Sequence, residues 1–324
     1  MNFNVNVGVG AVFKLVVRKA DTDEIVHETP EFHNLVLTTG LARMAVNTWI
    51  DRCCVGTGNS APVASQVALD SFLASTTATA SGTSDSGGIQ VTTAPYYWFG
   101  RRTWRFAVGV ATGNISEIGL GWANSNLWNR ALVKDTAGNP TTITVLADEY
   151  LDVISEVRVY PQESTGSFNL VDKVGVIISE HTYIARPRFS SYEAGGATWR
   201  ASTVQYSSNG QLSFAGLFGI GDSSIPIAPT GAVTTKFTTG NLVHTALNNG
   251  LKASKVISSS EANTASMHKS FTSNLFGLMC GGAFNYLGVN SCGYNWEVNP
   301  AIPKDAETIL TYSFTLTWGN YAPE

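Results

Sequence analysis

The sequence predicts a mainly β protein with two tandem antiparallel β-sandwich-like domains and one or two short helices in the N-terminal half. Three observations favour this fold class. Apolar and polar residues alternate in many short segments, Gly, Asn and Pro residues separate these segments, and helical spacing recurs clearly in only one place. A chain of 324 residues exceeds the usual size of one domain. We therefore expect domains over residues 1–163 and 164–324.

The first nine residues after Met1 alternate strictly, as a half-buried strand does. One face carries Phe3, Val5, Val7 and Val9, and the other carries only Asn and Gly. Two interpretations remain open. The segment is either an arm that adds to the sheet of a neighbouring subunit, or the first strand of its own domain. The arm makes these four apolar residues a candidate subunit interface, and deleting Met1–Gly10 would then leave the fold intact. Gly within a strand also marks a close approach of another part of the chain.

The next elements predict a hairpin and a helix. Val12–Val17 can pair with Ile25–His27 across the turn Asp21–Glu24. Leu41, Met44, Ala45 and Thr48 follow at helical spacing after the cap candidates Thr38 and Thr39. A second short helix is predicted at Val67–Leu73, and the Ser-, Thr- and Gly-rich segment Ala74–Thr93 is predicted to be a long loop.

Further strands are predicted wherever apolar residues recur at every second position. These strands carry the residues Trp104, Phe106, Val108 and Val110; Leu151, Val153, Val157 and Val159; Val174, Val176 and Ile178; and Leu310, Tyr312, Phe314, Leu316 and Trp318. A hairpin turn is predicted at Asn209-Gly210. The strand Leu151–Val159 matches the strand Leu310–Trp318 in phase, and each follows a predicted Asn-Pro turn, at Asn139-Pro140 and Asn299-Pro300. This match indicates either an internal duplication or a chance similarity of two amphipathic strands.

Composition restricts the partners and the compartment. Only 14% of the residues are charged, against about 25% in ordinary soluble domains. Such a surface must be covered by small polar residues or by other chains. A net charge of −4 argues against nucleic acid as the main partner. The N-terminus lacks a signal-peptide pattern, and no apolar run reaches the roughly 20 residues of a membrane helix. Synthesis in a reducing cytoplasm is therefore expected.

The cysteines fit that compartment. Cys53 and Cys54 are adjacent, and Cys280 and Cys292 lack the paired spacing of a zinc site. All four are expected to be thiols, and Cys280–Cys292 is the only plausible bridge within the chain.

The sequence predicts no catalytic, cofactor-binding or metal-binding residues, and therefore no enzyme. The five histidines are scattered, and none stands at ligand spacing from another. The Gly-x-Ser-x-Gly pattern of a nucleophilic serine does not occur. The acidic residues of the second half are spread among polar segments, so they give no support for the carboxylate pair of a glycosidase.

The aromatic residues indicate possible contact surfaces more clearly than the acidic residues do. Tyr96, Tyr97, Trp98 and Phe99 are consecutive, so on a strand they point to both faces, and one face must find cover outside its own sheet. We expect another subunit to supply that cover. Candidate receptor or glycan contacts stand in the second half, at Tyr192, Tyr206, Tyr294 and Trp296. For the last two, a subunit interface, a glycan contact and the core stay open as alternatives.

Several of these segments together resemble a known module. They are Phe32–Leu35, a short helix ending near Ile50, Val55–Pro62, Gln66–Leu69, Ile115–Gly119, Leu127–Leu132, Gly138–Pro140, Glu149–Val153 and the closing strand Thr311–Gly319. This pattern resembles a module of tail-fibre, collar and baseplate proteins of tailed bacteriophages. Apart from the closing strand, it extends over roughly residues 30–160, about half of the chain. The resemblance implies a structural protein of the virus particle.

The expected function is a structural component of a phage tail tip, baseplate or tail fibre that acts by oligomeric assembly. The implied partners are copies of the chain itself, in a trimer or a larger ring, other tail proteins, and a host-surface receptor or glycan. Nucleic acid binding and membrane insertion are not expected. The expected location is the virion tail, after synthesis in the host cytoplasm. A receptor- or glycan-binding fibre head is the alternative, followed by a glycan depolymerase or a capsid decoration protein.

Overall fold

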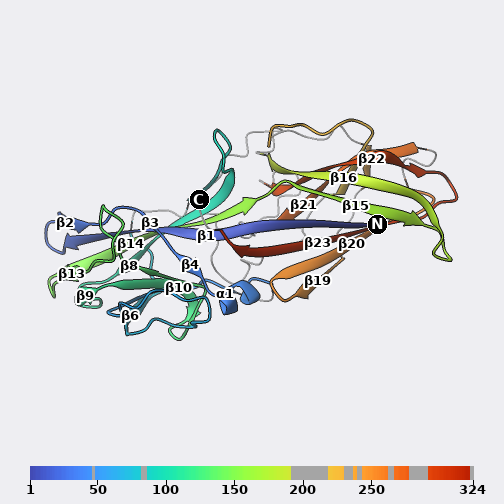
Figure 1. Ribbon diagram of the computed structural model, residues 1–324. Helices are drawn as coiled ribbons and strands as arrows, with labels where there is room; N and C mark the ends of the chain where they lie inside the picture. Colours follow the sequence, from blue (N-terminus) through green and yellow to red (C-terminus); the bar gives the residue numbers. More distant parts are fainter. Residues whose placement is uncertain are drawn as a thin grey trace.

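The fold is mainly β, as the alternation predicted, with 60% of residues in strands and 2% in helix. We describe a computed structural model over residues 1–45, 48–81, 86–190, 218–229, 236–238, 243–261, 266–276 and 291–321. The predicted turn at Asn209-Gly210 lies outside these described residues. Three larger sheets and one two-stranded sheet form two lobes, which Figure 1 shows side by side.

The longest sheet runs through both lobes. Its strands are β1 (Asn2–Lys19), β2 (Ile25–Glu28), β3 (Phe32–His33), β7 (Ser86–Gln90), β8 (Tyr97–Phe106), β14 (Glu149–Pro161), β19 (Val243–Leu247), β20 (Gly250–Ile257) and β23 (Leu310–Asn320). The strand order is β19-β20-β23-β1-β14-β8-β7, and β2 and β3 pair with β1. We call it the long sheet.

A second sheet lies in each lobe. The N-terminal sheet has the order β4-β12-β10-β5-β6 with β11 beside β10, and its strands are β4 (Leu35–Val36), β5 (Arg52–Gly56), β6 (Phe72–Thr76), β10 (Glu117–Ala123), β11 (Asn126–Leu127) and β12 (Asn129–Leu132). The C-terminal sheet has the order β15-β16-β22-β21-β17-β18, and its strands are β15 (Ser164–Val171), β16 (Ile177–Ser190), β17 (Phe218–Gly221), β18 (Lys236–Thr238), β21 (Ser266–Phe276) and β22 (Ser291–Lys304). A small sheet pairs β9 (Gly113–Ile115) with β13 (Ile143–Val145).

Strand β1 belongs to both lobes. Residues Val7–Lys19 pair antiparallel with β14, and residues Asn2–Val9 pair parallel with β23. The predicted boundary near residue 163 does fall between two strands, because β14 ends at Pro161 and β15 begins at Ser164. The first residues of the chain nevertheless complete the lobe formed by the last residues, so the two lobes share one continuous strand.

The arm interpretation of the N-terminal strand is wrong for this fold. Phe3, Val5, Val7 and Val9 are 0–3% exposed in the chain's own core, so they have no surface to offer a second subunit. The Phe3 ring lies 5.0–6.0 Å from six other aromatic rings, those of Phe168, Tyr183, Phe271, Trp296, Tyr312 and Phe314. Because these rings come from the long sheet and the C-terminal sheet, Phe3 lies at the centre of the C-terminal lobe. The prediction that deleting Met1–Gly10 leaves the fold intact depended on the arm interpretation, so it no longer has a basis.

The two similar strands, β14 and β23, flank β1 on opposite sides. Gly8 stands opposite Tyr160 of β14 and Gly319 of β23 at the same time. A Cβ atom at Gly8 would lie 2.9 Å from Tyr321, so the glycine permits the close approach that its position in a strand indicated. The predicted Asn-Pro turn before β23 is wrong, since Asn299 and Pro300 lie within strand β22.

The local predictions for the first 110 residues are confirmed in part. Strand β1 forms the expected hairpin with β2, in which Val17 stands opposite His27. The helix is shorter than predicted: α1 spans Thr38–Arg43, and Thr38 lies inside it because Leu37 is the N-cap. Val67–Leu73 is not helical, since strand β6 begins at Phe72. The predicted loop Ala74–Thr93 contains the end of β6 and strand β7, and Val108 and Val110 lie beyond the end of β8 in exposed positions.

Candidate functional site

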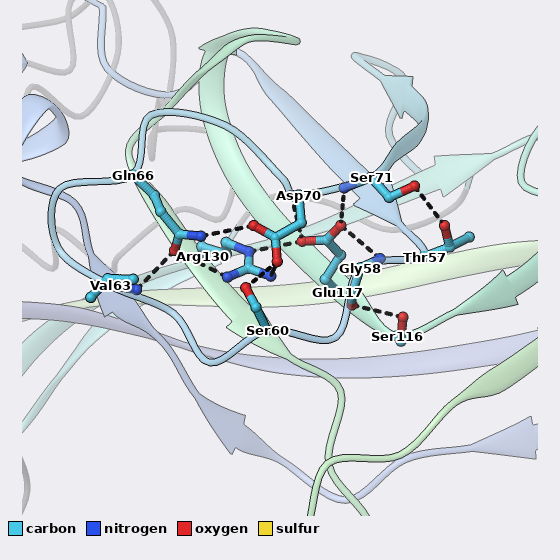
Figure 2. A network of polar contacts seen from close by, with 10 residues as sticks. All are labelled: Thr57, Gly58, Ser60, Val63, Gln66, Asp70, Ser71, Ser116, Glu117 and Arg130. Carbon is cyan, nitrogen blue, oxygen red and sulfur yellow. Dashed lines mark hydrogen bonds and ion pairs between the residues drawn. The ribbon is translucent and has the colours of Figure 1, made fainter.

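A buried polar network ties the N-terminal sheet to the loop of residues 57–71. Its four central side chains are Gln66, Asp70, Glu117 and Arg130, which we call the loop clamp. Glu117 comes from β10 and Arg130 from the neighbouring strand β12, whereas Gln66 and Asp70 come from the loop (Figure 2). Glu117 and Arg130 are both 0% exposed.

The Glu117 carboxylate is the centre of the clamp. One oxygen accepts hydrogen bonds from the backbone N–H groups of Gly58 at 2.9 Å and Ser71 at 2.8 Å. The other accepts from the backbone N–H of Asp70 at 3.0 Å and from Nε of Arg130 at 2.8 Å. Charged acceptors with several donors form strong hydrogen bonds. One side chain thus holds both ends of the loop.

The Arg130 guanidinium distributes its remaining donors over the same loop. Nη1 donates to Oε1 of Gln66 at 3.0 Å, and Nη2 donates to Oδ2 of Asp70 at 2.8 Å. The Gln66 amide in turn donates to Oδ1 of Asp70 at 2.8 Å, and Ser60 donates its hydroxyl to Oδ2 of Asp70. A planar guanidinium suits this role because its donors point in several set directions.

Two glycines make room for the clamp. A Cβ atom at Gly58 would lie 2.4 Å from Oε1 of Glu117, and one at Gly56 would lie 2.6 Å from the same oxygen. Real Cβ atoms do not approach other atoms so closely. The run Val55-Gly56-Thr57-Gly58 therefore allows the loop backbone to reach the buried carboxylate. The hydroxyl of Ser116 adds a hydrogen bond to the carbonyl of Gly58 at 2.9 Å.

The clamp has a structural role. The four Glu117 hydrogen bonds occupy both carboxylate oxygens, and the Arg130 side chain is enclosed by its three acceptors. A buried ion pair is well tolerated only when such hydrogen bonds offset the loss of water. We conclude that these residues hold the loop of residues 57–71 in one position.

The second feature is the outer face of β8 and β14. Trp98 points into the core and is 2% exposed, whereas its neighbours Tyr97 and Phe99 are half-buried on the opposite face. Tyr97 lies 6.1 Å from Phe99 and 5.2 Å from Tyr160, measured between ring centroids. The Tyr160 ring stacks on Tyr321 at 3.6 Å. The prediction that the aromatic run points both ways is confirmed. Tyr160 of the same chain covers part of the Tyr97 ring, and cover by another subunit stays a prediction.

Ion pairs cross this outer face. Arg101 and Arg158 both contact the Glu156 carboxylate, at 2.5 Å and 2.6 Å, and Arg105 contacts Asp152 at 2.6 Å. The Arg158 guanidinium also lies over the Tyr97 ring, 4.6 Å from its centroid. The Asp152 hydrogen bond is the main cause that raises the pKa of Arg105. Arginine and aromatic side chains of this kind are enriched in protein interfaces.

The candidate receptor or glycan contacts are only partly located. Tyr294 and Trp296 are both 0% exposed on strand β22, so the core alternative is correct for them and the glycan alternative is wrong. Tyr192 and Tyr206 lie outside the described residues. Of the remaining interface candidates, Tyr96 is half-buried and packs against the core.

Two buried cysteines and the buried His268 lie outside the clamp. Burial raises the pKa of the Cys54 thiol to about 12 and raises that of Cys53 as well, so both buried cysteines are protonated at neutral pH. Cys280 lies outside the described residues, and the Cys280–Cys292 bridge stays a prediction. His268 donates to or accepts from the Tyr312 hydroxyl at 2.6 Å, and its pKa is lowered to about 4 by burial and by Lys304.

Within the described part of the chain, His, Cys, Asp and Glu residues form no group of three or more that could hold a metal ion. None of the helical structure in that part has the length and apolar character that crossing a bilayer requires. Comparisons with protein-family models, with curated proteins and with solved structures found no match to this chain.

Proposed function

We propose that this chain is a structural component of a bacteriophage tail, in the tail tip, baseplate or tail fibre, and acts by oligomeric assembly. The loop clamp is the observation that carries the proposal. Its residues lie in or next to four of the segments that resemble the phage module, namely Val55–Pro62, Gln66–Leu69, Ile115–Gly119 and Leu127–Leu132. The charged residues of that module therefore hold a loop in place, as a scaffold requires.

The shared strand also supports a scaffold. Strand β1 contains 18 residues, which at about 3.3 Å per residue span roughly 60 Å. It is hydrogen-bonded to β14 in one lobe and to β23 in the other. Bending the lobes against each other would break this ladder, so the shared strand resists such bending.

The outer face of β8 and β14 supports assembly. Its half-buried rings and its Arg–Glu and Arg–Asp pairs combine the residue types that protein interfaces favour. In a chain with 14% charged residues, covering such a face with another tail protein or a sister chain removes apolar surface from water.

Immunogold electron microscopy tests the proposal. Antibodies raised against the purified chain are applied to virions of the phage that encodes it, with pre-immune serum as the control. Gold on the tail, at its tip, baseplate or fibres, is the expected result. Gold confined to the capsid, or no label on either intact or disrupted virions, would overturn the proposal.

A further inference from the structure

The hairpin of β15 and β16 ends in a cluster of exposed aliphatic side chains. Val171, Val174, Val176, Ile177 and Ile178 are 49%, 83%, 60%, 52% and 61% exposed. They fall within eight consecutive residues at the connection between the two strands, at the end of the C-terminal lobe (Figure 1). Contiguous exposed apolar side chains of this kind mark interaction sites more often than single ones do.

The tip holds these residues in a set conformation. The Asp172 carboxylate accepts hydrogen bonds from the backbone N–H groups of Val174 at 2.9 Å and Val176 at 2.8 Å. The backbone N–H of Asp172 donates to the carbonyl of Val176 at 2.9 Å, and Gly175 supplies the positive φ of +89° that the turn needs. The aliphatic cluster is therefore preformed, and its exposure belongs to an ordered turn.

Strand β15 leads to this aliphatic tip and forms an open sheet edge. Among the strands of the described residues, β15 pairs only with β16, so its other side is unpaired. The strand reads Ser164-Thr-Gly-Ser-Phe-Asn-Leu-Val171 and contains neither a charged residue nor a proline. Natural sheet edges are usually protected by charges, prolines or bulges against addition of another strand. These eight residues contain no charge and no proline, and the register of β15 against β16 shifts only between Leu170 and Val171, next to the tip. The stretch Ser164–Leu170 therefore has none of these protections.

Charges of opposite sign flank the uncharged edge. Glu163 precedes it and Lys173 follows it, and both residues are exposed. Glu163 pairs with Arg186 of its own chain at 3.1 Å but keeps 54% of its side chain exposed. The neighbouring Asp172 carboxylate accepts hydrogen bonds from the turn backbone.

We infer that β15 is a self-association edge, to which a second copy of this chain adds its own β15 in antiparallel orientation. A two-fold axis that passes at Phe168 places Lys173 of each copy next to Glu163 of the other, at both ends of the contact. A parallel arrangement would bring like charges together. The edge supplies backbone hydrogen bonds, and the aliphatic tip extends the contact. This inference rests on the proposed function, because it names the partner in the assembly.

Sedimentation equilibrium of the full-length chain tests the inference with two sets of variants. The first compares V174D/V176D with I227D/I309D, whose wild-type side chains are 86% and 62% exposed and so match the tip residues in exposure. The second compares E163K, K173E and the double reversal E163K/K173E. Thermal melts of every variant verify that each one is folded.

We expect the wild-type chain to self-associate and V174D/V176D to weaken the association about tenfold or more, with I227D/I309D unchanged. Each single charge reversal weakens it by a comparable factor, because it places like charges together, and the double reversal restores it. If V174D/V176D and the single reversals associate as strongly as the wild type, the β15 contact is overturned, while the proposed function stays in place. A wild-type chain that stays monomeric at every concentration would overturn the β15 contact, whereas the proposed function, which also allows other tail proteins as partners, is tested separately by the immunogold labelling.

Discussion

The Glu117 carboxylate accepts a hydrogen bond from Nε of Arg130 at 2.8 Å, and neither residue is exposed to solvent. Their strands are neighbours in the N-terminal sheet, and Glu117 also binds three backbone N–H groups of the residue 57–71 loop. One buried ion pair thus connects the sheet to a surface loop. This relationship makes the loop part of the folded core, and it can be tested by mutation.

Replacing the carboxylate tests the clamp. The variant Glu117→Gln keeps the shape of the side chain but removes the fully buried carboxylate, so that only Asp70 remains as the anionic partner of Arg130. The free energy of unfolding should fall by about 1.5–3 kcal/mol, as for the loss of a hydrogen bond to a charged group. The matched control is Glu28→Gln, which removes the exposed Lys14–Glu28 pair at 2.9 Å and costs about 0–1 kcal/mol. Urea unfolding followed by circular dichroism gives both values. Equal losses in the two variants would contradict the clamp.

The close contact between the Gly58 backbone and the Glu117 carboxylate gives an independent prediction. Gly58→Ala forces a Cβ atom to within 2.4 Å of the Glu117 carboxylate, and overpacking of this kind costs roughly 1–3 kcal/mol. Gly319→Ala is the control, because a Cβ atom there meets nothing within 4 Å. It should change stability by less than about 0.5 kcal/mol. Thermal unfolding of both variants provides the comparison, and a Gly58→Ala variant as stable as wild type would refute this account of the glycines.

The shared strand predicts that the first residues stabilise the C-terminal lobe. Phe3→Ala removes the ring at the centre of six aromatic contacts and should lower the free energy of unfolding by about 3–5 kcal/mol. Phe99→Ala, on the half-buried outer face, should cost on the order of 1 kcal/mol. Near-ultraviolet circular dichroism reports the aromatic packing during urea unfolding. An unchanged signal and midpoint for Phe3→Ala would show that the lobe does not need this strand.

His268 predicts a loss of stability in acid. Burial and the charge of Lys304 lower the pKa of His268 from 6.5 to about 4, so folding favours the neutral ring. The contribution is complete above pH 6.5, and about 3 kcal/mol is lost as the pH falls to about 4. Urea unfolding between pH 7 and pH 4 should show this loss in the wild type but not in His268→Gln, which serves as the control. Parallel pH profiles for the two proteins would contradict the assignment.

Alternation in the sequence predicted the buried face of β1, β14 and β23 but not which strands pair. It failed at Val174, Val176 and Ile178, which are exposed, and the first two lie before strand β16 begins. Phe3, Val5, Val7 and Val9 lie on one apolar face, as expected. Period-two spacing contains no information about the neighbouring strand, so the parallel pairing of β1 with β23 could not be derived from it. The same limit explains why the arm interpretation was wrong. The sequence pattern of an apolar strand face is the same whether the strand that covers it is far away in the same chain, as β23 is, or belongs to another chain.

The residues of the clamp were individually visible in the sequence. Glu117 and Arg130 each stand within a short apolar strand of a chain with few charges, and a buried charge needs a partner of opposite sign. That signal could have paired them, but Gln66 and Asp70 come from a loop whose path the sequence does not give. Interface, glycan contact and core stayed open for Tyr294 and Trp296, although their spacing of two, continued by Val298, indicates a buried strand.

Hydrogen–deuterium exchange of the wild-type chain at increasing protein concentration tests most directly whether sister copies cover its exposed sheet surfaces. The account predicts that backbone amides of residues 164–178 exchange more slowly as the concentration rises, while the amides of β1, already buried within the chain, keep the same rate. Exchange rates of residues 164–178 that stay the same from dilute to concentrated protein would contradict it.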